Sequence, residues 1–160
     1  MRKVLVFLAI GVLAASAGAA GAYFTGQAQV PENLIRAGSV AVSAEPTSAA
    51  LSMEAVAPGG TQWRPLTVGN DGQLPVSVVV TNAKKAGITD FYEALQVTAT
   101  VDGQVVYEGA LSAMRTAPFT LAPGARAAMR FGVGLPATAG NDLAGDYAKT
   151  TLYVDAEQVR

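Results

Sequence analysis

The sequence predicts an all-β protein: an antiparallel, two-sheet β-sandwich of the jelly-roll kind, with one or two short helices in its loops. Apolar and polar residues alternate along most of the chain, and β-branched residues are frequent. Glycine- and proline-containing turn signals separate these runs, as in sandwiches that have turns roughly every 8–12 residues. Cysteine is absent, so strand pairing and packing must supply the stability.

The first strands are expected in residues 39–44, 50–56 and 74–82. The first two alternate small or apolar residues with polar ones, and the third is β-branched at five of its nine positions. Both patterns suit a half-buried sheet better than a helix.

The best hairpin signal is Asp102-Gly103, between the apolar runs 95–101 and 104–109. A type I′ turn needs positive φ at both central positions, and Asp-Gly is among the pairs that adopt it most readily. Residues 125–135 and 147–158 predict two more long strands.

The run 88–96 interrupts the strand pattern. Thr89 or Asp90 could cap a short helix, with Phe91 and Leu95 at positions i and i+4 on its inward face. An ordinary loop fixed by one aromatic side chain is the alternative.

Two prolines and the single tryptophan fall within the strand runs. Pro65 and Pro75 should lie on sheet edges or at strand entry, because proline donates no ladder hydrogen bond. Trp63 is expected in the core with Leu66 and Val68, rather than on a ligand-stacking surface. The other aromatic residues expected in the core are Phe91, Tyr107, Phe119 and Phe131.

The N-terminus has the order of a secretory signal peptide. Charged residues 1–3 precede the apolar run 4–15 and then a stretch of small residues. Ala20 and Ala22 occupy the −3 and −1 positions of a small-x-small site, which predicts cleavage before Tyr23. The alternative is an uncleaved anchor, whose last third of Ala, Gly and Ser would give weak hydrophobic drive.

Cleavage divides the chain into a signal peptide (1–22), an extended N-terminal segment (23–42) and a β-sandwich domain (43–160). Loss of Arg2 and Lys3 lowers Lys plus Arg from 11 to 9 against 12 Asp plus Glu, a formal charge of about −3. No nucleic-acid partner is expected at this charge. The membrane is contacted only through the signal peptide.

Histidine and cysteine are both absent, which removes the commonest general base, the usual zinc ligands and the thiolate nucleophile. We expect neither enzymatic activity nor a cofactor. The one plausible calcium cluster is Asn141, Asp142 and Asp146, and a solvated loop is its simpler interpretation.

Four motifs, in this order, resemble the TasA/camelysin family of exported proteins. They are "LIRAGSVAV" (34–42), "VAPGG" (56–60), "NDGQL" (70–74) and "LPATAGNDLAGDYAKTTLYVDAEQ" (135–158). The chain departs from the family pattern at Gly60, where an Asp is usual, and at Leu143-Ala144, where Tyr-Gln is usual.

The resemblance implies an extracellular or biofilm matrix fibre subunit with a jelly-roll domain, processed by a SipW-type signal peptidase. It also implies that the N-terminal segment of one subunit completes the sheet of its neighbour, so the partner is a second copy, head to tail. The residues that would carry this assembly are Tyr23, Phe24, Val30, Leu34, Val40 and Val42. Two alternatives remain open: a monomeric secreted or cell-surface binding module, and a metallopeptidase by the family's other name.

N-terminal sequencing of the exported protein is expected to give Tyr23 as its first residue. A signal peptidase that requires small residues at −3 and −1 would cut there. A blocked cut, with Met1 or Arg2 still present in the membrane fraction, would identify a permanent anchor instead.

Overall fold

The computed structural model describes residues 25–30, 36–37, 40–47 and 56–159. Within these ranges, no helix is long and apolar enough to cross a membrane. The predicted signal peptide, Tyr23, Phe24, Leu34 and residues 50–55 of an expected strand lie outside them. The strands are β1 (Thr25–Val30), β2 (Arg36–Ala37), β3 (Val40–Glu45), β4 (Thr61–Asn70), β5 (Val76–Gly87), β6 (Gln96–Val101), β7 (Gln104–Ala110), β8 (Phe119–Leu121), β9 (Arg126–Gly134) and β10 (Ala148–Gln158). The helices are α1 (Thr89–Ala94) and the 3₁₀ turns η1 (Leu111–Ala113) and η2 (Asn141–Leu143).

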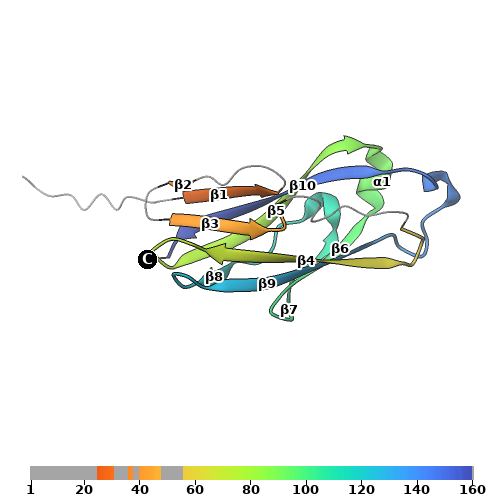
Figure 1. The fold of residues 1–160 in the computed structure, drawn as a ribbon. Helices are drawn as coiled ribbons and strands as arrows, with labels where there is room; N and C mark the ends of the chain where they lie inside the picture. Colours follow the sequence, from red (N-terminus) through yellow and green to blue (C-terminus); the bar gives the residue numbers. More distant parts are fainter. Residues whose placement is uncertain (1–24, 31–35, 38–39, 48–55, 160) are drawn as a thin grey trace, which may run out of the picture.

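Two antiparallel sheets form the sandwich, as predicted (Figure 1). The four-stranded sheet has the order β1-β10-β5-β8, and the six-stranded sheet has the order β2-β3-β4-β9-β6-β7. Several consecutive strands, such as β4 and β5 or β9 and β10, lie in opposite sheets. The chain therefore crosses between the layers repeatedly, as in a jelly roll.

The core lies between the inner faces of the sheets. On β5 the buried residues alternate with partly exposed ones over its first five positions, as the period of two requires. The four-stranded sheet contributes Val76, Val78, Val80, Leu152, Val154 and Ala156, and the six-stranded sheet contributes Val40, Val42, Leu66, Val68, Met129 and Phe131.

The local predictions that depend on turn chemistry are confirmed. Asp102 and Gly103 have φ values of 48° and 87°, and they join β6 to β7. Pro75 immediately precedes β5. Pro65 lies inside β4 opposite Arg130 of β9. The described pairing of β4 with β3 begins only at Thr67, so β4 is an edge strand at the position of Pro65.

The helix predicted near residue 90 is present, but its predicted cap is wrong. The N-cap residue is Ile88, with no side-chain cap hydrogen bond, and Thr89 is already helical. Lys84 Nζ donates instead to the Thr89 hydroxyl at 2.6 Å. Phe91 and Leu95 are buried as expected.

Asn70 joins the two sheets through a buried amide. It is 0% exposed at the end of β4. Its Nδ2 donates to the carbonyls of Leu74 (2.8 Å) and of Leu121 on β8 (3.1 Å). Its Oδ1 accepts the Gly72 N–H at 3.0 Å, so one side chain satisfies three backbone groups.

Asn70→Ala is expected to lower the free energy of unfolding by about 2–4 kcal/mol, because these backbone groups lose their partners where water is excluded. Chemical denaturation measures the loss. Thr67→Ala, on the partly exposed face of the same strand, is the matched control and should cost less than about 1 kcal/mol. Equal losses in the two variants would show that the amide has no special role.

Candidate functional site: the β1 edge and an apolar cavity

The N-terminal strand β1 forms one edge of the four-stranded sheet. It pairs antiparallel with β10 from Thr25 opposite Glu157 to Val30 opposite Leu152. β10 pairs on its other side with β5, through a register that shifts between Lys149 and Thr150. The backbone of β10 is thus paired on both sides over residues 152–157.

The assembly residues assigned from the sequence fall into different environments. Val30 ends β1 at the sheet edge. Val40 and Val42 lie on β3 and are 0% exposed in the core of their own chain. The domain boundary placed at residue 43 therefore falls inside β3. Of the described parts of the proposed donor segment, β1 lies at an edge of the four-stranded sheet and β2 at an edge of the six-stranded sheet.

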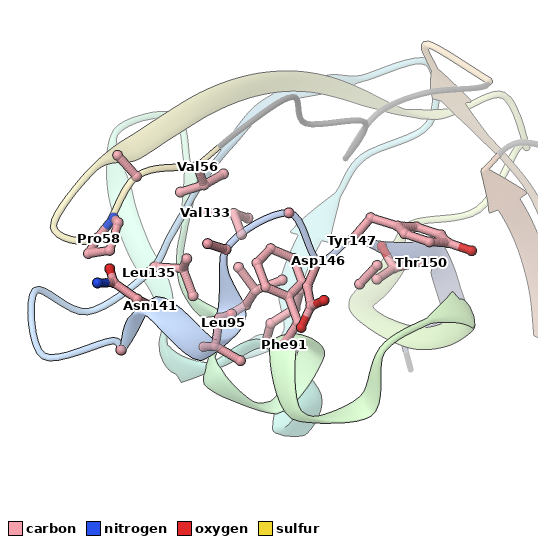
Figure 2. Close-up of a pocket in the computed structure, with 17 residues that line it drawn as sticks. Val56, Pro58, Phe91, Leu95, Val133, Leu135, Asn141, Asp146, Tyr147 and Thr150 are labelled. Atoms are coloured by element: carbon pink, nitrogen blue, oxygen red, sulfur yellow. The ribbon is translucent and has the colours of Figure 1, made fainter.

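A cavity of about 520 Å³ opens at one end of the sandwich. Figure 1 shows α1 and the connection from β9 to β10 at the end far from the C-terminus. The walls also include Val56 and Pro58, which precede β4, and Figure 2 shows them facing Leu135 and Leu95 across the cavity. The lining thus comes from segments that are distant in the sequence.

The deep part of this cavity is apolar. Five of its lining residues belong to the buried core and are at most 9% exposed: Phe91, Leu95, Leu111, Val133 and Leu135. A β-bridge joins Pro58 to Leu135, and the Gly59 N–H donates to the Leu135 carbonyl at 2.9 Å. These contacts hold the segment before β4 in place as one wall of the cavity.

A short chain of hydrogen bonds links α1 and η1, which both contribute to the cavity wall, to β5. The Tyr92 hydroxyl donates to Asn82 Oδ1 at 2.6 Å, and Asn82 Nδ2 donates to the Leu111 carbonyl. Burial raises the pKa of Tyr92 above 10.0, and the hydrogen bond to Asn82 opposes that shift in part. The buried phenol thus orients the helix that carries Phe91.

The cavity mouth is more polar and more exposed. Among the described lining residues, Asp146 is the one that carries a charge, and Asn141 lines the cavity as well. Thr150 also lines it, and its hydroxyl oxygen is buried without a hydrogen-bond partner. Tyr147 is 56% exposed and its ring extends away from the apolar cluster (Figure 2).

The three calcium candidates are only partly brought together. Asn141 and Asp146 line the cavity, whereas Asp142 does not. Among the described residues, no group of three Asp, Glu, His or Cys side chains is placed to hold a metal. The loop instead closes the sandwich over the cavity.

The prediction that Trp63 lies in the core is wrong, because its side chain is 42% exposed. Leu66 and Val68 are buried, and residue 63 differs from both in parity, so its side chain must leave the strand on the other face. The ring lies over Gly132, where a Cβ would come within 2.7 Å of it. Arg130 lies 5.1 Å from the ring centroid, a cation–π distance.

No family model and no curated protein matches this chain.

The Tyr92 phenol gives the protein a specific pH dependence. Because its folded pKa is raised, its contribution to stability is present below pH 10 and is lost as the pH rises through the folded pKa. In wild type, the free energy of unfolding should fall above pH 10 by up to about 1.4 kcal/mol per unit from this group. Tyr92→Phe should lack that component in pH-dependent denaturation. Identical slopes in both proteins would contradict the assignment.

Proposed function

We propose that the protein is a secreted structural subunit that assembles head to tail by strand complementation, in the manner of TasA/camelysin matrix proteins. The observation that carries the proposal is the position of β1. It is an edge strand, it pairs with β10, and it begins two residues after the predicted cleavage site at Ala22. Export would free this end of the chain.

The same β10 edge can accept β1 of a neighbouring subunit in the same register. Strand pairing is made by backbone groups, so the ladder opposite Leu152 to Glu157 is equally good in either arrangement. A chain that gives its β1 away and receives another keeps every sheet hydrogen bond. The contact is heterologous and does not close on itself, so it gives filaments.

The proposed location is extracellular, at the cell surface or in the matrix, and the proposed activity is structural. The complete lack of His and Cys supports a non-enzymatic role over a camelysin-type peptidase, whose zinc site would need imidazole ligands.

Electron microscopy at rising concentration tests the assembly. The chain from Tyr23 onward should form fibres, and a version that lacks residues 23–30 should not. The deletion ends at Val30 so that Val40 and Val42 remain in the core. A synthetic peptide of residues 23–30 should bind the shortened chain and should cap fibre growth of the chain from Tyr23 onward, because it occupies the β10 edge without supplying a second β10 edge for the next subunit.

Two proline variants supply the matched control. Successive N–H groups of an edge strand point alternately toward its partner and away from it. One of Gln27→Pro and Ala28→Pro should therefore abolish fibres, and the other should retain them. Fibres that persist in both variants, or in the deletion, would refute assembly through β1.

A further inference from the structure

We propose that the apolar cavity between α1, the 56–58 segment and the β9–β10 connection binds a small amphipathic cation: a molecule with an apolar body and an amine head. This proposal rests on the cavity alone and does not depend on fibre assembly.

The size and lining of the cavity suit a small ligand. Its volume of about 520 Å³ lies within the range of roughly 300–1,000 Å³ that is typical of ligand sites. Its deep part is walled by core residues such as Leu111 and Val133, each 2% exposed. Binding is favourable when an apolar ligand body replaces water against apolar surface of this kind.

Apolar surface continues out of the mouth. Tyr147 and Ile88 are 56% and 46% exposed, and they are two of the five most exposed large hydrophobic residues in the described ranges. The Ile88 N–H donates to the Tyr147 carbonyl at 3.0 Å, which holds the two residues together. Exposed apolar surface beside a cavity is typical of a binding site.

The polar groups at the mouth select the charge. Among the described residues that line the cavity, Asp146 is the one that carries a charge, and none is Lys or Arg. A carboxylate beside an apolar wall favours a cationic head and disfavours an anionic one. Thr150 Oγ1, buried and without a hydrogen-bond partner, is a second polar group that a small adjustment could offer to a ligand.

Three compounds with one apolar body test this: 4-phenylbutylamine, 4-phenylbutanol and 4-phenylbutyrate, titrated into the chain from Tyr23 onward. That chain contains every described element. Calorimetry should give one site per chain, with the amine bound about two- to fivefold tighter than the alcohol, as for a partly exposed ion pair. The carboxylate should bind most weakly. Amide NMR shifts should concentrate at residues 133–135 and 143–150.

Three variants locate the site. Asp146→Asn should remove the preference for the amine and leave alcohol binding unchanged. Asp142→Asn, in the same loop but outside the cavity lining, is the matched control and should keep the preference. Ala144→Trp places a large side chain at the mouth and should weaken all three compounds at least tenfold without lowering the melting temperature.

Several results would overturn the proposal. One is the absence of binding by all three compounds at millimolar concentration, and another is equal binding of the three by wild type. Binding that survives Ala144→Trp would place the ligand elsewhere. Binding that appears only after Leu51 and Met53 are changed to Ser would assign the cavity to the chain's own segment 48–55.

Discussion

The fold depends on the need of β10 for hydrogen-bond partners on both of its sides. Buried backbone groups must be paired, and β10 receives β5 on one side and β1 on the other. β1 is the first described strand and β10 is the last, so the four-stranded sheet is complete only when the two ends of the described chain meet. Whatever occupies the β1 position therefore decides whether the backbone of β10 is paired on that side.

The two ends of the sandwich are closed by different means. Near β1, closure is made by strands and by the Asn70 amide, which ties β4 to the backbone of β8. Near α1, it is made by a helix and connecting loops, and these enclose a cavity instead of a continuous core (Figures 1 and 2). Backbone pairing thus dominates one end of the molecule, and apolar surface without a partner dominates the other.

The sequence was most informative where one local rule determines the structure. Asp102-Gly103 defined the hairpin because its φ requirement is local, and alternation identified β5, β9 and β10. The core prediction for Trp63 is wrong because it was based on the size of the apolar ring. Residues 63 and 66 are an odd number of positions apart, so their side chains lie on opposite faces of the strand. The cavity was missed because its walls come from separate segments, such as 56–58, 91–95 and 133–135, whose proximity depends on strand order. Alternation within single strands carries no information on that order.

In the proposed assembly, closed subunits compete with fibres because the β1–β10 ladder is the same in the two arrangements. If the hydrogen bonds are equal, the balance depends on concentration. A tethered β1 acts at an effective concentration of roughly millimolar order, so a neighbour's β1 replaces it only where the local concentration of neighbouring chains is comparable or higher. In the same proposal, crowding of exported chains at a cell surface would raise the neighbour's share, and each fibre would keep a free β1 at one end and an open β10 edge at the other. The cavity is lined by residues of α1 and of the β9–β10 connection, and these elements lie at the end of the sandwich away from β1 (Figure 1). The proposed ligand would therefore not compete for the β10 edge, and the two proposed properties can vary independently.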